Sequence, residues 1–441
     1  MIRKLFLPID NAGLILFRIF FGLLLSIETF GAIFTGWVKH NFIDPKFTFS
    51  YIGMEWIQPL PGNGMYFYFA VMGVLGLLVM FGYKYRFSIG LFTILWAGAY
   101  FMQKSSYNNH YYLLLLISLI MFFLPANRFC SLDVRKNPAI RSYVMPQWCS
   151  WVMILQISIV YFFASISKVY PGWMDGTFIN IAFKDSTTNA LLQELFSQRW
   201  FHIFIAYSGI VFDLFIVPLL LWKRTRTIAF VASIFFHLFN ALFLKIGIFP
   251  FFALSFVVFF YPAEKVRKLF FSKQVAPEGQ QTKMVGESVL KYFFIPYFII
   301  QLALPVRHYF IKGDVLWTEE GHRMSWRMML RARSGYTEFK VRDNSTGEVF
   351  FYDLRRHLSA KQISFVGTKP DGIWQMAQYI KKEYKAKGKD VSIFVDSKIA
   401  INHGDYKPLV NPETDFAKAK WDYFFHNEWV LLYDENGRLI R

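Results

Sequence analysis

The sequence has few cysteines and lacks the short motifs that mark many soluble catalytic sites. Its two cysteines, Cys130 and Cys149, have no Cys-x-x-Cys spacing and define neither a disulfide framework nor a metal site. The nine histidines show no His-x-x-His or His-Glu-x-x-His spacing, and carboxylates are scarce in the apolar segments, so we expect no metal. No phosphate-binding glycine loop and no Gly-x-Ser-x-Gly sequence occurs, which argues against nucleotide and serine-hydrolase chemistry.

Apolar residues, by contrast, make up 55% of the 441 residues, and phenylalanine alone supplies 52. This composition predicts an integral membrane protein. The net charge of +18 is explained by cytoplasmic loops that meet anionic lipid head groups, so we expect membrane lipids and no nucleic acid as partners. The amino end lacks a small-residue cleavage pattern and is interpreted as a retained first helix.

Long apolar runs predict nine membrane spans. They cover residues 11–35, 65–83, 87–104, 110–126, 146–169, 203–222, 226–244, 247–262 and 291–310. The eighth is short and contains Pro250, which removes a backbone hydrogen bond that lipid cannot replace. We therefore expect the eighth span to be bent or partly re-entrant.

The distribution of Lys and Arg predicts the orientation of these spans, because cytoplasmic loops retain positive charge. With the amino end in the cytoplasm, the cytoplasmic connections hold 17 of these residues and the outer connections hold six. We expect the carboxyl-terminal region on the outer side, and a bacterial inner membrane as the location. We expect a monomer.

The composition changes near Gly313, where the long apolar runs stop. We divide the chain into a transmembrane helical catalytic domain at 1–312 and a soluble outer domain at 313–441. Residues 336–354 alternate around an Asn-Ser-Thr-Gly turn like a hairpin, 373–388 have helical spacing, and 391–401 and 428–440 are predicted strands. The outer domain is predicted to be α+β or mostly β.

Lys168 is the unusual residue, because it ends the apolar fifth span. It is either an anchor that extends to the water interface or an amine held in a dry, reactive place. The predicted topology brings Asn109 and His110, at the start of the fourth span, to the same outer end. Tyr161 lies two turns before Lys168 on the same helical face. This convergence favours a functional amine, which can act as a base when it is desolvated.

Other polar residues occur inside predicted spans. His237 and Asn240 lie three residues apart on one face of the seventh span, where they either line a site or join two helices. For Arg18, Glu28 and Asp213 we favour a structural ion pair or hydrogen bond.

These residues occur in a pattern that resembles the vitamin K-dependent γ-glutamyl carboxylases and the bacterial proteins grouped with them as horizontally transferred transmembrane (HTTM) proteins. The resemblance covers most of the chain. It rests on Asn108-Asn109-His110, Gln156 to Phe162 with Lys168 and Trp173-x-x-Gly176, Phe236-His237-x-x-Asn240, Ile246-Gly247-x-Phe249, Ser325-Trp326-x-Met328-Met329 with Arg333-Ser334, and Trp421 followed by Trp429.

The resemblance implies an enzyme that uses reduced vitamin K, a phylloquinone or menaquinone hydroquinone, with O2 and CO2. It implies that Lys168 is the base that deprotonates the hydroquinone and that His110 and Asn109 help to hold it. The quinone becomes an epoxide, and the strong base that results removes a γ-proton from peptidyl glutamate, whose carbanion captures CO2. We add Tyr161, His237 and Asn240 to the cofactor pocket.

The resemblance also implies that the outer domain engages a glutamate-containing peptide or protein. We assign Trp173, Lys184, Trp326 and Arg331 to substrate binding. The sequence departs from the family pattern at four positions. Ser167 stands where animal members have lysine, and Gly172 stands where the family has an acidic residue. Lys184 stands where an arginine is expected, and Arg331 stands where a histidine is expected. Quinone epoxidation without carboxylation stays open, as does a non-catalytic membrane scaffold that binds a lipid, quinone or partner.

Overall fold

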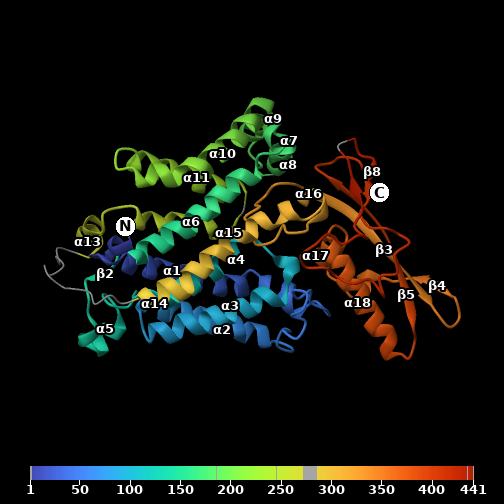
Figure 1. Cartoon of the computed structure of the whole chain (residues 1–441), viewed down its shortest axis with the longest axis horizontal. Coiled ribbons are helices and arrows are strands. Elements are labelled where there is room, and N and C mark those ends of the chain that lie inside the picture. Colours follow the sequence, from blue (N-terminus) through green and yellow to red (C-terminus); the bar gives the residue numbers. More distant parts are fainter. Residues whose placement is uncertain (1, 185, 245, 272–285, 435, 441) are drawn as a thin grey trace.

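The computed structural model describes residues 2–184, 186–244, 246–271, 286–434 and 436–440, and these residues are mostly helical. Long helices lie side by side in one part of the molecule, and the strands of the carboxyl-terminal region gather at one end of it (Figure 1). The chain therefore combines a helical bundle with a sheet-containing carboxyl-terminal region.

Six helical segments in the described ranges are long and apolar enough to cross a membrane, or seven if one bent helix pair counts as a span. The six are α1 (Ala12–Phe34), α2 (Gly64–Phe81), α6 (Trp148–Ser167), α10 (Arg199–Leu221), α11 (Arg226–Phe243) and the segment Glu287–Phe310, which includes α15 (Ile295–Val306). The prediction of nine spans is therefore not supported.

The third and fourth predicted spans form helices that do not meet these criteria. Helix α4 (Asn109–Phe123) has 15 residues and is about 22 Å long, less than the roughly 30 Å hydrocarbon core of a bilayer. Helix α3 (Tyr85–Met102) carries Arg86 in its first turn. Residues of α4 such as Leu113 and Ile117 are fully buried. Apolar sequence in these helices therefore serves packing within the bundle.

The eighth predicted span is broken, as expected, but not at Pro250. Helix α12 (Phe249–Ser255) continues as a 3-10 turn, and α13 (Ala263–Phe270) leaves at an angle of 115°. Pro250 lies in the first turn of α12, where a missing N–H breaks no helical hydrogen bond. The bend comes at Pro262, directly before α13. The position of each proline relative to the helix therefore decides where the segment bends: Pro250, inside the first turn of α12, is tolerated, and Pro262, between two helical segments, marks the bend.

The carboxyl-terminal region is α+β. Its four-stranded antiparallel sheet has the order β4-β3-β5-β6, with β3 at Arg333–Asp343, β4 at Val349–Phe351, β5 at Val391–Ile401 and β6 at Lys407–Pro408. Helices α17 (Ala360–Val366) and α18 (Pro370–Ala386) precede β5, and β7 (Leu432–Tyr433) pairs with β8 (Leu439–Ile440). The predicted hairpin, the helix and the strand at 391–401 are confirmed, whereas the described residues within 428–440 form only the short strands β7 and β8.

This region is fastened to the connection between α1 and α2. Phe49 of that connection is fully buried in the core of the carboxyl-terminal region. Gln375 donates to the Ser50 carbonyl at 2.9 Å, and Gln362 donates to the Phe47 carbonyl at 2.6 Å. The connection before α4 joins the same end through the Lys104 to Asp371 ion pair, 2.6 Å long. The loops predicted to lie on the outer side therefore meet the carboxyl-terminal region, while the side of the membrane that they face stays a prediction.

Candidate functional site

A cavity of about 110 Å³ opens among α6, α10, α11 and α12, next to the carboxyl-terminal region. Its walls are largely aromatic and aliphatic. The polar and charged side chains that line it are His110, Tyr161, Lys168, Asp213, His237 and Asn240. Four distant segments of the sequence thus bring six polar groups to one apolar space.

Lys168 lies directly after α6 and forms a buried ion pair across the bundle. Its Nζ is 2.5 Å from Oδ2 of Asp213 on α10 and 3.1 Å from the carbonyl oxygen of Ala164. Lys168 is 8% exposed and Asp213 is 6% exposed. An interfacial anchor would extend its ammonium into water, whereas this ammonium turns inward onto a carboxylate.

The indole of Trp173 forms a second contact with Lys168. The ammonium lies 5.5 Å from the centre of the indole ring, a distance at which a cation is attracted to an aromatic face. The indole N–H donates to the Ala206 carbonyl at 3.0 Å, which fixes the ring against α10. The position of the Lys168 side chain is therefore set by α10 on one side and by Trp173 on the other.

Two imidazoles, those of His110 and His237, also line the cavity. The Tyr161 hydroxyl and Nε2 of His237 are hydrogen-bonded at 2.9 Å, while Nδ1 of His237 is buried without a partner among the described residues. The His110 ring is stacked on Phe249, with centroids 4.0 Å apart and planes at 15°. Nδ1 of His237 is therefore a polar atom that a ligand can satisfy.

Asn109 does not line the cavity. Its side chain accepts a hydrogen bond from the Tyr107 hydroxyl at 2.8 Å and donates to the Arg327 carbonyl at 3.1 Å. Arg327 directly precedes Met328 and Met329, which do line the cavity. Asn109, predicted to hold the cofactor, is thus placed to position the segment that closes the cavity.

The closing segment has an unusual backbone. Met324, Trp326 and Met329 all have positive φ angles, of 60°, 57° and 47°. Non-glycine residues rarely adopt this conformation, and tertiary contacts must hold it. Trp326 supplies such a contact, because it is fully buried and its ring lies 5.0 Å from that of Tyr112. The carboxyl-terminal region therefore begins with a packed segment that forms one wall of the cavity.

The four residues predicted to bind substrate are not brought together. Trp173 lines the cavity, and Trp326 lies behind its wall. Lys184 is exposed directly after α8 (Thr177–Phe183). Arg331 is ion-paired with Glu319 in the carboxyl-terminal region.

Glu319 is the centre of a buried cationic cluster. Besides Arg331, it contacts Lys369 at 2.6 Å and Arg333 at 3.4 Å. Burial alone would raise the pKa of Glu319, but the surrounding cations hold that pKa well below its usual range. Burial also lowers the pKa of Lys369 to about 7. Arg331 is therefore engaged in holding this cluster together. Within the described ranges, no group of three or more His, Cys, Asp or Glu residues could hold a metal ion.

Comparison with known families agrees with this arrangement. A family model described as the HTTM domain matches residues 6–264, and the model of the vitamin K-dependent gamma-carboxylase lumenal domain matches residues 286–436. The chain belongs to the γ-glutamyl carboxylase family. The apolar helices and the lumenal-domain match together indicate an integral membrane protein, and family membership implies the use of vitamin K. No solved structure matches the chain.

In this member of the γ-glutamyl carboxylase family, Asp213 is the site residue that the sequence analysis missed. It was assigned a structural ion pair or hydrogen bond. The structure gives it an ion pair, but the partner is Lys168 and the pair lines the cavity. A carboxylate within an apolar span is expensive and usually functional, and that signal, weighed together with Lys168, would have found the pair.

Proposed function

We propose that this protein is a reduced-naphthoquinone-dependent γ-glutamyl carboxylase, which couples quinone epoxidation to the carboxylation of peptidyl glutamate. The observation that carries the proposal is the buried Lys168 to Asp213 ion pair at the wall of an apolar cavity, in a chain with both domains of the family. A cavity with a few convergent polar groups is the usual form of a small-molecule site.

The lining residues fit an aromatic diol. Phe178, Phe236 and Phe249 offer flat apolar surfaces, and Nδ1 of His237 offers an unpaired polar atom. When bound, the hydroquinone would react with O2 and supply the strong base that removes the γ-proton of glutamate before CO2 adds. Exclusion of water by the aromatic walls would protect that base from quenching.

Lys168 and Asp213 are best considered together as the proton acceptor. As an ion pair, they take up one proton at the Asp213 carboxylate, while the Lys168 ammonium balances the negative charge left on the proton donor. The two atoms are 2.5 Å apart and nearly dry, so their interaction is far stronger than in water. In this arrangement Asp213 is the base, and Lys168, which was predicted to be the base, stabilises the negative charge left on the proton donor.

His237 would orient the ligand. When the Tyr161 hydroxyl donates to Nε2, the neutral ring carries its proton on Nδ1 and offers a donor to the cavity. His110, stacked on Phe249, and Asn240 supply further polar atoms along the same wall. These residues would fix which oxygen of the diol faces Lys168.

The experiment is an assay of the reconstituted full-length protein with a menaquinone hydroquinone, labelled bicarbonate and a glutamyl peptide. The wild type should form both epoxide and labelled peptide. Lys168→Ala should lower both by about 10²- to 10⁴-fold, the usual effect of losing an acid–base group. Lys223→Ala, which removes an exposed lysine from the connection between α10 and α11, is the matched control and should form epoxide at the wild-type rate. Full activity of Lys168→Ala would disprove the role of this pair.

A second candidate is quinone epoxidation without carboxylation. It is favoured by the positions of Lys184 and Arg331, since the former is exposed and the latter is engaged with Glu319. In that case the wild type forms epoxide and leaves the peptide unlabelled. A non-catalytic scaffold would form neither product and would tolerate replacement of Lys168 and His110.

A further inference from the structure

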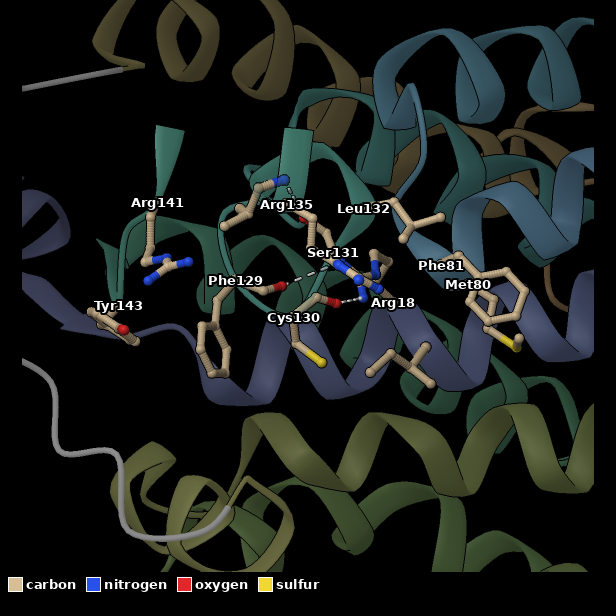
Figure 2. A pocket seen from close by; sticks show the side chains of 12 residues that line it. Arg18, Met80, Phe81, Phe129, Cys130, Ser131, Leu132, Arg135, Arg141 and Tyr143 are labelled. Atoms are coloured by element: carbon tan, nitrogen blue, oxygen red, sulfur yellow. Dashed lines mark hydrogen bonds between the residues drawn. The ribbon is translucent and has the colours of Figure 1, made fainter. Parts of the chain in front are cut away.

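A second cavity of about 500 Å³ lies at the end of the bundle away from the carboxyl-terminal region, beside α5 (Leu132–Lys136) (Figures 1 and 2). It is bounded by α1, the end of α2 and the connection that follows α4. None of the residues proposed above for catalysis lines it. It is thus a separate site, and its lining differs in chemistry from the first.

Arg18 of α1 borders this cavity, and its side chain is completely buried. Its guanidinium donates to the carbonyl oxygens of Ala126 at 3.0 Å and Cys130 at 2.6 Å, while Nε has no partner among the described residues. Among the residues that the structure describes, no carboxylate oxygen lies within 4.0 Å of a nitrogen of the Arg18 guanidinium. The positive charge of Arg18 is therefore held by neutral backbone carbonyls, and its Nε–H donates to none of the described residues.

Arg135 and Arg141 add two exposed guanidiniums to the same cavity (Figure 2). Neither forms an ion pair with any described residue. The neighbouring acid, Asp133, is already engaged, because it accepts hydrogen bonds from the backbone N–H groups of Lys84 and Tyr85 at the start of α3. Within the described residues, none of the three arginines that share this cavity thus has a carboxylate as an ion-pair partner.

The rest of the lining is apolar and belongs to the membrane-spanning helices. Ile19 of α1 and Met80 and Phe81 of α2 form one wall, and the Phe81 side chain is 51% exposed. The wall therefore continues from the cationic part of the cavity onto the surface that the helices present to lipid. A phosphate with acyl chains attached matches both parts, whereas a free phosphate matches only the arginines.

We propose that this cavity binds the phosphate group of an anionic phospholipid from the surrounding bilayer. The exposed guanidiniums of Arg135 and Arg141 bind the phosphate oxygens, since a guanidinium offers paired donors with the geometry of phosphate, and the buried Arg18 adds its positive charge to the wall of the cavity. The acyl chains lie along Met80 and Phe81. Basic pockets between spanning helices are suited to such head groups.

Cys130 provides a native probe of occupancy. It lines the cavity and is exposed, whereas Cys149 is buried. We suggest measuring the rate at which an uncharged maleimide modifies Cys130 in the full-length protein, in nanodiscs of phosphatidylcholine with and without phosphatidylglycerol. In the wild type, phosphatidylglycerol should slow the modification.

The variant R135Q/R141Q tests the arginines without disturbing the buried Arg18. Each exposed arginine should contribute about fivefold to lipid affinity, so the double variant should need about 25-fold more phosphatidylglycerol for the same protection. The matched control K223Q/R224Q removes two exposed charges from the connection between α10 and α11 and should keep wild-type protection. Binding counted directly by native mass spectrometry should rank the three proteins in the same way.

Three results would overturn the proposal. These are equal modification rates with and without phosphatidylglycerol, equal loss of protection in both double variants, and full protection by inorganic phosphate in phosphatidylcholine nanodiscs. The last result would assign the arginines to a soluble anion in place of a lipid.

Discussion

The ion pair between Lys168 and Asp213 makes a prediction that separates structure from chemistry. The proposed variants are Lys168→Met, Asp213→Leu and the double variant with both changes. Each single change leaves one charge buried without its partner, whereas the double change leaves two apolar side chains of suitable size. Stability and catalysis should therefore respond to the double change in opposite ways.

The expected change in unfolding free energy follows from the burial of the two charges. Removing one partner of a buried pair costs about 3–5 kcal/mol of unfolding free energy, because the remaining charge is dehydrated and unpaired. Both residues here are less than a tenth exposed and 2.5 Å apart, so the full effect is expected. Replacing both partners by apolar residues is often neutral or stabilising. The double variant should thus regain wild-type stability.

Activity should not return with stability. Hydroquinone epoxidation should fall by about 10²- to 10⁴-fold in the single variants and stay low in the double variant. The assays are thermal unfolding in detergent and chromatographic detection of the epoxide. A double variant that recovers both stability and epoxidation would show that the pair is only structural. Single variants of wild-type stability would show that the pair is not buried as described.

Three further predictions concern other parts of the molecule. His237→Phe should raise the KM for hydroquinone and should unfold as the wild type does. Tyr161→Phe should raise this KM less, because it leaves the imidazole of His237 in place. Equal KM values for the wild type and His237→Phe would exclude a contact between His237 and the ligand. Burial would raise the pKa of Asp371, but Arg323 and Lys104 hold that pKa well below its usual range. The ionised Asp371 should therefore stabilise the fold fully above pH ~4, and this stabilisation should be lost as the pH falls further. Unfolding measured against pH tests this, and Asp371→Asn should weaken the loss of stability at acid pH. Cys130, at the end away from the carboxyl-terminal region, should react with an impermeant maleimide in inverted vesicles and not in intact cells if the predicted orientation is right; the reverse pattern would invert it.

Local structure could be predicted closely where one sequence pattern has one structural meaning. Residues 391–401 are buried or half-buried throughout, with alternation in the middle of the range, and form β5 over that same range. The first span, predicted at 11–35, is α1 at Ala12–Phe34. In both cases the signal is local, because side-chain periodicity or an unbroken apolar run specifies the element by itself.

The number of spans could not be predicted, because hydropathy does not distinguish a helix buried by protein from one buried by lipid. Helix α4 is apolar since it packs inside the bundle, yet it is too short to cross a bilayer unaided. The same limit applies to the site. Asp213 is 45 residues from Lys168 in sequence, and only tertiary structure brings them together.

The sequence pointed to candidate site residues but not to what each one touches. His110, Tyr161, Lys168 and His237 line one cavity, while their roles stay a prediction. The sequence could not show that Asn109 holds a neighbouring segment. Hydrogen-bond partners depend on side-chain directions in the folded chain, and a motif in one sequence does not contain them.

The central claim is that the cavity beside Lys168 binds a naphthoquinone, and bound quinone can be measured directly. The protein should be purified from membranes and its bound lipids identified by mass spectrometry. Gly209 lines the cavity, and a Cβ there would meet only ordinary contacts, so Gly209→Leu should fill the cavity from within. Gly31→Leu, where a Cβ meets no atom within 4 Å, is the matched control. We predict a naphthoquinone in the wild type and in Gly31→Leu but not in Gly209→Leu, and equal amounts in all three would contradict the account.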